Sequence, residues 1–187
     1  MTRQVRFLVP PDEIVADQVV LRRWSPSQVG AMVAAVAESR EHLKPWMPWA
    51  QKPLDERTYA DLVARAQESF QAGREFAYAM FPPDDASKVV GSCGLHARRG
   101  PDTLEIGYWV HVDHGGRGLA TAAADALTSV AFDLGATRVE IRCDEANLPS
   151  AAVARKAGFT LQGVRDREPE APGHSGREMV WVKTRST

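Results

Sequence analysis

Hydrophobic and polar positions follow two different rhythms along this chain. Residues 119–134 carry apolar side chains at spacings of three and four, which predicts a helix with one buried stripe that Gly135 ends. Residues 104–112 are rich in branched and aromatic side chains, which favours a strand. Alternation along this strand places Glu105, Gly107 and Trp109 on one face, opposite a continuous apolar face. The face that carries Glu105 is therefore predicted to line a cleft.

The same two rhythms predict the remaining elements. Helices are expected at 27–37, at 55–72 and in a short segment that ends at 157. Strands are expected at 19–22, 75–80, 88–96, 138–143 and 178–183. Residues 165–175 combine charge, Pro and Gly, which predicts a mobile, solvated loop. A mixture of strands and helices in a chain of 187 residues predicts one α/β domain over residues 1–187.

A glycine-rich turn joins the strand at 104–112 to the helix at 119–134. Gly115, Gly116 and Gly118 permit a tight turn and a close approach of the backbone to a ligand. The first turn of the helix that follows presents unpaired N–H groups and the positive end of the helix dipole. This arrangement predicts a site for an anion, most often a phosphate.

Two other phosphate-binding motifs fit this turn less well. A Walker loop needs four residues between its first glycine and a Gly-Lys pair, and the turn does not supply this spacing. A dinucleotide-binding turn needs a third small residue where Thr121 stands, although Glu140 on the next predicted strand imitates its ribose-binding acid. The turn also lies late in the chain, which leaves little room for a catalytic domain after it.

The segment from Gly115 to Ala120 resembles the acyl-CoA loop of the GNAT N-acetyltransferase superfamily. That loop has Gln or Arg, two residues, Gly, one residue, and then Gly or Ala. Gly118 and Ala120 match the pattern, while Gly115 stands at the Gln or Arg position. The departure removes one side-chain contact and leaves the backbone amides in place.

Two further segments carry the same resemblance. Residues 147–159 are similar to the family's later motif, in which an Asn precedes a short helix that ends in Gly-Phe. Residues 42–49 resemble the Leu-x-Pro-Trp-x-Pro-Trp segment of the RimJ/RimL-type branch, which includes ribosomal-protein N-terminal acetyltransferases and relatives that acetylate small amines. The resemblance covers most of the chain, from about residue 19 to residue 181.

The resemblance implies both the fold and the cosubstrate. It implies a single GNAT-like α/β (α+β) domain with a central mixed, mostly antiparallel, twisted sheet flanked by helices. It also implies a splay between the two strands on either side of the loop's helix, where acetyl-CoA binds as cosubstrate without a metal. The residues implied in this binding are Val110, His111, Val112, Gly115, Gly116, Arg117, Gly118, Leu119, Ala120, Thr121 and Asn147.

Acetyl transfer from a thioester to an amine needs a neutral amine, a stabilised oxyanion and a proton for the departing thiolate. By resemblance, Glu105 aligns with a strand Glu that is the general base of histone-acetylating members; a solvated surface residue is the alternative. The proton-donating Tyr of many members is replaced here by Ala154. RimL-like members use a Ser where Ser150 stands, and a hydrogen bond to the helix start is its alternative role.

Trp46, Trp49 and His96 are the candidates for binding the acceptor, and core packing is the alternative for both tryptophans. The predicted acceptor is a primary amine, either the N-terminal amine of a (ribosomal) protein or a polyamine, an antibiotic or an amino-acid derivative. A non-catalytic acyl-CoA-binding module is the alternative from another class, which Gly115 and Ala154 favour. Relatives of this branch imply a homodimer.

Charge and composition narrow the remaining classes. A formal net charge of -1 gives no basic surface for nucleic acid. The apolar runs are too short to cross a membrane and no leader segment is visible, so a cytoplasmic location is expected. Cys93 and Cys143 are expected to be reduced, buried thiols. No metal site is expected, because His111 and His114 on the turn have no supporting Cys cluster or His pair on a helix.

Overall fold

A single sheet organises the part of the chain that the computed structural model describes, residues 7–185. Its eight strands lie in the order β1-β2-β3-β4-β5-β6-β8-β7. The strands are β1 (Glu13–Ala16), β2 (Val19–Arg23), β3 (Glu75–Phe81), β4 (Gly91–His96), β5 (Thr103–Val110), β6 (Arg138–Asp144), β7 (Thr160–Asp166) and β8 (Arg177–Thr184). The ends of the domain predicted at 1–187, residues 1–6 and 186–187, lie outside the described residues.

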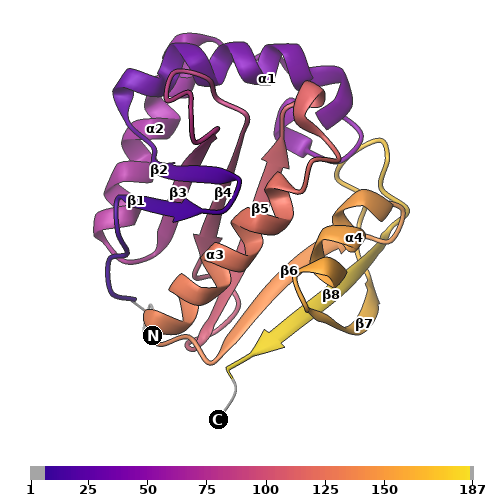
Figure 1. Ribbon diagram of the computed structural model, residues 1–187. Coiled ribbons are helices and arrows are strands. Elements are labelled where there is room, and N and C mark those ends of the chain that lie inside the picture. The colour runs from indigo at the N-terminus through magenta and orange to yellow at the C-terminus, as the bar shows by residue number, and fades with distance from the viewer. Residues whose placement is uncertain (1–6, 186–187) are drawn as a thin grey trace.

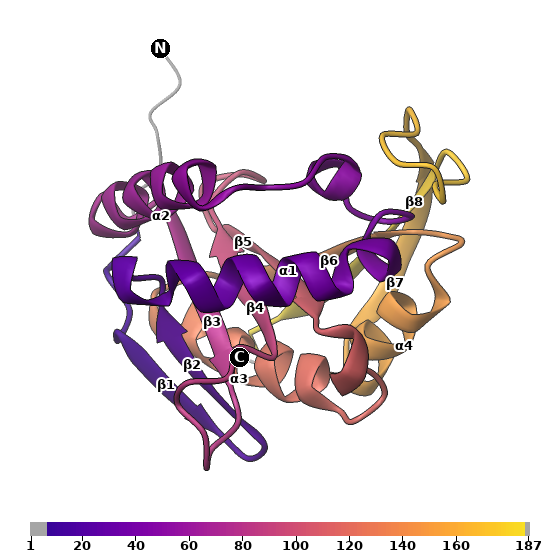
Figure 2. The ribbon, with the colours of Figure 1, turned by 90° about the horizontal axis from the view of Figure 1, so that it is seen from above.

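Four α-helices surround this sheet. They are α1 (Val29–Leu43), α2 (Glu56–Gln71), α3 (Leu119–Asp133) and α4 (Leu148–Lys156), and short 3-10 turns precede α1 and α2. Figure 1 shows α3 and α4 in front of the sheet, α2 behind it and α1 across its upper end. The view from above in Figure 2 places α2 and α3 on opposite sides of the strands. The sheet is therefore the middle layer of the fold.

The pairing of β5 with β6 is parallel, whereas every other pairing in the sheet is antiparallel. A parallel neighbour requires a crossover connection, and α3 provides it. The β5–β6 ladder ends at the pair Ile106–Ile141, although β5 continues to Val110. This confirms the predicted mixed sheet and the splay between the two strands that flank α3.

Two apolar clusters hold the helices on the sheet. The first lies under α3 and α4 and includes Leu104, Ile106 and Leu127, all buried. The second joins α1 and α2 to the opposite face through residues such as Met32, Val63 and Trp109. Trp109 thus packs in a core, although its face of β5 was predicted to line a cleft. Both faces of β5 are covered at this point.

The predicted strands and helices are confirmed apart from their ends, and the structure adds two strands. The helix expected at 27–37 continues to Leu43, because buried Ser39 and Leu43 extend its inner stripe beyond the apolar residues. β1 and β7 were not predicted. β7 is largely exposed and contains an irregularity between Leu161 and Gly163, so it shows no regular alternation of polar and apolar side chains. β7 is a strand because it pairs with β8, and not because of a pattern in its own side chains.

The prediction of a solvated loop at 165–175 is wrong in two respects. β7 continues through Arg165 and Asp166, and Ala171 is buried. The Gly173 amide donates to the carbonyl oxygen of Pro45 at 2.9 Å, and the His174 Nε2 lies 3.1 Å from the carbonyl oxygen of Trp46. We call these two contacts the loop bridge. It joins the β7–β8 loop to the segment between α1 and α2.

Within residues 7–185 no helix combines the length and the apolar composition needed to cross a membrane.

Candidate active site

The turn before α3 depends on two glycines. Gly116 and Gly118 have φ angles of 74° and 81°, a left-handed conformation that L side chains rarely adopt. Gly118 caps α3, so the unpaired amides of Leu119, Ala120 and Thr121 follow it at once. Gly115 has an ordinary φ of -61°. Side chains are therefore excluded at Gly116 and Gly118 and tolerated at Gly115.

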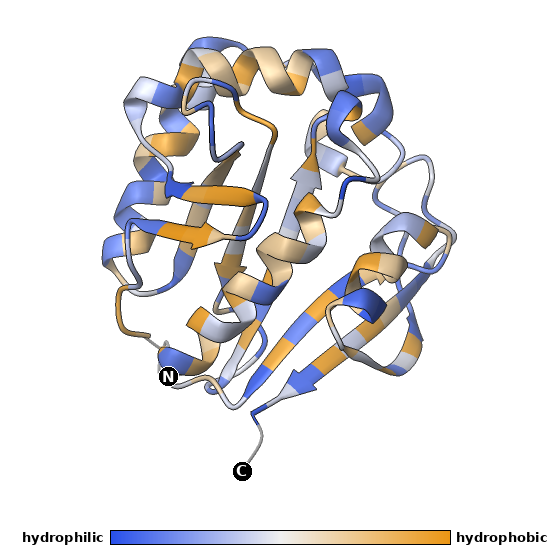
Figure 3. Ribbon diagram, viewed as in Figure 1, coloured by the Kyte–Doolittle hydropathy of each residue, from blue (hydrophilic) through white to orange (hydrophobic). Residues whose placement is uncertain are grey.

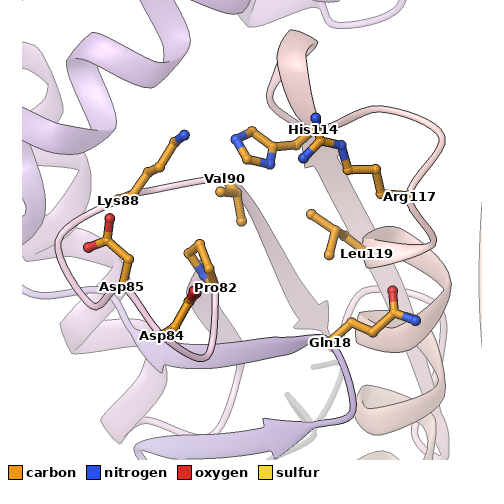
Figure 4. A pocket seen from close by; sticks show the side chains of 9 residues that line it. All are labelled: Gln18, Pro82, Asp84, Asp85, Lys88, Val90, His114, Arg117 and Leu119. Atoms are coloured by element: carbon orange, nitrogen blue, oxygen red, sulfur yellow. The ribbon is translucent and has the colours of Figure 1, made fainter.

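Two surface pockets border this turn, and Gln18 lines both of them. The first, with a volume of about 450 Å³, is lined by Arg117, Leu119, His114 and Lys88 together with Gln18 and Asp84 (Figure 4). The second, of about 560 Å³, is lined by Gly118 and Thr121 on α3 and by Lys156 at the end of α4. Burial and the nearby charges of Lys88 and Arg117 lower the pKa of His114. Lys88 and Arg117 are the cationic groups that this pocket offers to an anionic ligand, and Asp84 and Asp85 also line it.

The end of β5 is fastened to α1. His111 Nε2 lies 2.8 Å from a carboxylate oxygen of Glu38, and its Nδ1 accepts from the Asp113 amide at 3.2 Å. A ring that accepts at Nδ1 and donates at Nε2 is neutral. The Val112 amide donates to the buried Ser39 hydroxyl at 3.1 Å. The ring of His111 and the amide of Val112, both predicted to bind the cosubstrate, are therefore engaged within the protein.

The splay exposes backbone groups of β5. In an antiparallel pair, alternate residues direct their N–H and C=O groups to the same neighbouring strand. The His111 amide donates to the carbonyl oxygen of Val90, the residue directly before β4, and Val110 lies opposite Gly91. The backbone polar groups of Tyr108 and Val110 therefore point away from β4. They point to the side on which β6 has already diverged. This edge is where a linear ligand can add to the sheet as a further strand.

The start of α4 closes the other side of the splay. Asn147 caps this helix, because its side-chain oxygen accepts from the Ser150 amide at 3.2 Å. The Ser150 Oγ lies 2.9 Å from the Tyr108 hydroxyl, which also donates to the Ser150 carbonyl oxygen at 3.2 Å. The sequence placed Tyr108 on the apolar face of its strand and did not predict this contact. A lone polar atom on that face was the available signal.

Glu105 is buried and doubly ion-paired. Arg98 donates to both carboxylate oxygens, at 2.6 and 3.2 Å, and Arg99 donates to one of them. Burial alone would raise the pKa of Glu105, but the hydrogen bonds and charges of Arg98 and Arg99 lower it to about 2. Glu105 is thus a carboxylate at all ordinary pH values, and its oxygens are occupied by two guanidinium groups.

The same face continues across β6 and β8 as an ionic row. Glu140 accepts from Arg138 at 2.7 Å and from Arg142 at 2.8 Å, and Glu178 accepts from Arg142 at 3.0 Å and from Arg167. Figure 3 shows hydrophilic and hydrophobic residues alternating along β6. We use the term ionic row for the buried carboxylates Glu105, Glu140 and Glu178 and the guanidinium groups of Arg98, Arg99, Arg138, Arg142 and Arg167. Each buried carboxylate has two arginine partners.

The three predicted acceptor residues lie near this face in different ways. The rings of Trp49 and Trp109 are 6.2 Å apart, and Trp49 is 38% exposed, so part of it is open to a ligand. His96 lies above Gly107, where a Cβ atom would come within 3.2 Å of its Nε2. Trp46 contributes its carbonyl oxygen to the loop bridge. Along β5 the face runs from Glu105 through Gly107 to Trp109.

Within the described residues, no three His, Cys, Asp or Glu side chains gather closely enough to hold a metal ion.

Residues 18–160 match the family model described as Acetyltransferase (GNAT) domain. The chain is 27% identical over 157 residues to a Bacillus subtilis (strain 168) protein named "Putative ribosomal N-acetyltransferase YdaF", covering 80% of this chain and 81% of that protein. It is 25% identical over 150 residues to the ribosomal-protein-serine acetyltransferase of Escherichia coli (strain K12), covering 80% and 83% of the two chains.

Solved structures show the same fold. The microcin C7 self-immunity acetyltransferase MccE, in complex with acetyl-CoA and AMP, superposes with a TM-score of 0.84 at 21% identity, covering 94% of this chain and 98% of that chain. RimL, the ribosomal L7/L12 α-N-protein acetyltransferase, in complex with coenzyme A, has a TM-score of 0.83 at 23% identity, covering 92% and 97%. The first of these structures contains acetyl-CoA and the second contains coenzyme A.

Proposed function

We propose that the acceptor is a protein N-terminal amine, from the premise that this chain belongs to the acetyltransferase (GNAT) family and is an acetyl-CoA-dependent N-acetyltransferase. Enzyme activity follows from that membership, so a non-catalytic module is no longer an alternative. The proposals below concern the binding of the cosubstrate, the roles of the catalytic residues and the nature of the amine.

The splay and the turn before α3 are the proposed site of acetyl-CoA. The free backbone edge of Tyr108 and Val110 would hold the amide-bearing pantetheine arm. The amides from Gly116 to Thr121 would hold the pyrophosphate, with Arg117 beside them. His111, Val112 and Gly115 would shape this site through their backbone, and Asn147 would do so by fixing the start of α4.

Ser150 is the proposed donor to the departing thiolate. Its amide is used by the Asn147 cap, whereas its hydroxyl stands in the splay against Tyr108. When the amine nitrogen bonds to the thioester carbon, the C–S bond breaks and its electron pair moves to sulfur. A hydroxyl that donates to this sulfur lowers the barrier to C–S cleavage. The amine gives up its proton to a base or to solvent.

Glu105 remains the sequence's candidate for that base, but its surroundings favour another role. An efficient general base has a pKa near the working pH, and the arginines hold the pKa of Glu105 at about 2. Glu105 also lies on the face of β5 opposite Tyr108, roughly 10 Å away along the strand. We use the term acceptor face for the face of β5 that carries Glu105, Gly107 and Trp109. We propose that Glu105 chiefly fixes Arg98 and Arg99 on this face and that water accepts the amine proton.

The charges of the ionic row are the observation on which the proposed acceptor class rests. A site for polyamines or other polycations would present unpaired carboxylates, but Glu105, Glu140 and Glu178 are each neutralised by two arginines. The face therefore repels an acceptor that carries a second positive charge near its reacting amine. It accepts an amine that has no further positive charge nearby. A peptide N-terminus meets this condition, and the relatives named for ribosomal-protein acetylation support the same choice.

A small, uncharged amine is the second candidate. We propose that the loop bridge, which holds Trp46, borders the acceptor face and favours a narrow acceptor. An extended peptide end and a compact metabolite both satisfy this condition.

Steady-state assays of thiol release with a panel of acceptors test the proposal. The panel holds short peptides with a free Ser or Ala N-terminus, the same peptides with a blocked N-terminus, spermidine and an aminoglycoside. We expect kcat/KM for the free peptides to exceed that for spermidine by about 100-fold or more. A higher kcat/KM for spermidine would overturn the proposed acceptor class, while turnover of the aminoglycoside alone would favour the small-amine alternative.

We also propose a cytoplasmic location and a homodimer. Cys93 and Cys143 are buried free thiols, as expected in a reducing compartment. β7 is an edge strand on which Leu161 is 42% exposed, which offers a surface for self-association. Sedimentation equilibrium tests the dimer, and a monomer at micromolar concentration would contradict it.

A further inference from the structure

The contact between Tyr108 and Ser150 joins two segments that are far apart in the sequence. Tyr108 lies on β5 beyond the end of the β5–β6 ladder, and Ser150 lies in the first turn of α4. The Tyr108 hydroxyl is 2.9 Å from the Ser150 Oγ and 3.2 Å from the Ser150 carbonyl oxygen. The side chain of Tyr108 thus spans the splay at the place where the thioester is proposed to lie.

The direction of these hydrogen bonds follows from the groups involved. A carbonyl oxygen only accepts, so the Tyr108 hydroxyl donates in the contact with the Ser150 carbonyl. The Tyr108 hydroxyl has a single hydrogen, so donation to the nearer Ser150 Oγ as well takes a three-centre bond that shares this hydrogen between the two oxygens. A serine hydroxyl that accepts in this way keeps its own hydrogen for another partner. Cys143 also lies within hydrogen-bonding reach of the Ser150 side chain.

The surroundings of Tyr108 keep it protonated. Burial raises its pKa above the ordinary value, and the hydrogen bond to Ser150 only partly offsets this effect. A tyrosine in this state remains protonated at neutral pH and so keeps a hydrogen that it can donate. Cys143, whose pKa burial also raises, lies next to Ser150 and is likewise a neutral neighbour.

We propose that Tyr108 is a positioning residue that donates to the Ser150 Oγ and directs the serine hydroxyl hydrogen into the splay, toward the sulfur of the thioester. This inference rests on the proposed role of Ser150. On α4 itself Ala154 has no hydroxyl, so β5 supplies the second hydroxyl group of the site. When the C–S bond breaks, the sulfur takes the electron pair, Ser150 donates to it, and the Tyr108 bond stabilises the partial charge on the serine oxygen.

A double-mutant cycle tests the inference. Tyr108→Phe removes one oxygen atom and keeps the aromatic ring. We expect it to lower kcat by about 10-fold with the KM for acetyl-CoA nearly unchanged, and Ser150→Ala to lower kcat by about 100-fold. In the Ser150→Ala background, Tyr108→Phe should have no further effect on kcat. Tyr59→Phe, a change at another buried tyrosine, is the matched control and should keep wild-type kinetics.

The outcomes separate the two levels of the account. If Ser150→Ala lowers kcat but Tyr108→Phe does not, or if the two effects multiply independently, the role of Tyr108 is overturned and that of Ser150 stands. If Ser150→Ala leaves kcat unchanged, both roles are overturned. Neither result depends on which amine is the acceptor, because each comparison uses the same amine throughout.

A spectroscopic measurement covers the case in which Tyr108→Phe does not fold. The chain contains three tyrosines, so the ring Cζ resonances of protein labelled with ¹³C-tyrosine are few enough to assign. Ser150→Ala should shift the Tyr108 resonance and leave those of Tyr59 and Tyr78 in place. An unmoved Tyr108 resonance would overturn the inference.

Discussion

At the scale of single residues, the glycine-rich turn before α3 depends on which of its glycines the backbone requires. Gly116 and Gly118 adopt positive φ angles, whereas Gly115 does not. A Cβ atom at Gly115 would meet the Val112 carbonyl oxygen at 3.7 Å, an ordinary contact. Gly115 is therefore a position where a side chain is absent although the backbone permits one.

Gly115→Arg should strengthen the binding of acetyl-CoA. The new guanidinium group would stand beside the proposed pyrophosphate site at the position where the family pattern has Gln or Arg. We expect the Kd to fall by about threefold to tenfold, as one charge-assisted hydrogen bond would provide. Isothermal titration calorimetry measures the Kd, with Gly118→Ala as the contrasting variant. Because Gly118 has a φ of 81°, Gly118→Ala should weaken binding. Weaker binding by Gly115→Arg would contradict the placement of the pyrophosphate.

Glu105 should link stability to pH. Its folded-state pKa of about 2 lies below the ordinary 4.5, so its ion pairs stabilise the fold above about pH 4.5 and lose this effect as the pH falls toward 2. The contribution is about 1–3 kcal/mol, because Arg98 is half exposed and screened by solvent. Urea denaturation should show Glu105→Gln less stable than wild type at pH 7, with the difference shrinking below pH 4.

The exposed pair of Glu13 with Arg22 provides the control for this measurement. Glu13 is 51% exposed in that pair, so Glu13→Gln should leave the free energy of unfolding nearly unchanged at both pH values. The same variants test the proposed proton acceptor. A loss of kcat by about 1000-fold in Glu105→Gln would show that Glu105 is the base, contrary to the role proposed here.

At the scale of elements, α1 holds the end of β5 in place through Ser39 and Glu38. Ser39→Ala should remove the hydrogen bond that holds the Val112 amide, at a cost of about 0.5–1.5 kcal/mol. For a chain of this size, Tm should fall by roughly 1–6 °C in calorimetry. Ser129→Ala on the exposed side of α3 is the matched control. Equal Tm values for the two variants would mean that this contact contributes nothing to stability.

The loop bridge should affect the acceptor and spare the cosubstrate. His174→Ala removes the ring that lies 3.1 Å from the Trp46 carbonyl oxygen. We expect the KM of the acceptor peptide to rise by about threefold or more, with the Kd of acetyl-CoA unchanged. His42→Ala, which alters an exposed residue of α1, should change neither value. A change confined to acetyl-CoA binding would place the acceptor elsewhere.

Sequence patterns predicted the elements whose own side chains determine them. The strand, turn and helix of residues 104–134 were all recognisable because alternation, positive-φ glycines and a helical stripe are local signals. β7 was missed because an edge strand with mostly exposed side chains is defined by its partner β8. The extension of α1 was missed because its inner surface there includes a buried serine, Ser39.

The sequence predicted the backbone elements of the candidate site, which are the strand, the glycine turn and the helix start. It did not predict the ion pairs and the hydroxyl contacts between side chains. Arg98 and Arg99 reach Glu105 because the β4–β5 register places His96 opposite Glu105, which leaves both arginines in the connecting turn. Two adjacent arginines between predicted strands were the available signal. Tyr108 and Ser150 are joined only by the tertiary fold, across 42 residues of sequence. Contacts of this kind depend on how α4 packs beside the splay.

At the scale of the whole molecule, one parallel pairing in an otherwise antiparallel sheet creates the site. The crossover through α3 places a helix start at the open end of β5, and the divergence of β6 leaves room for a ligand and for α4. The proposed acceptor face lies on the other side of β5, bounded by the ionic row and by Trp49. On this proposal the amine and the thioester would meet at β5 from opposite sides of the sheet.

Locating the transferred acetyl group tests this account most directly. A peptide with a free N-terminal serine and one internal lysine is incubated with the protein and acetyl-CoA, and tandem mass spectrometry assigns the product. The lysine side chain belongs to the same peptide, so the two amines compete at equal concentration. The account predicts acetylation of the N-terminal amine. Acetylation of the lysine alone, or of neither amine, would contradict it.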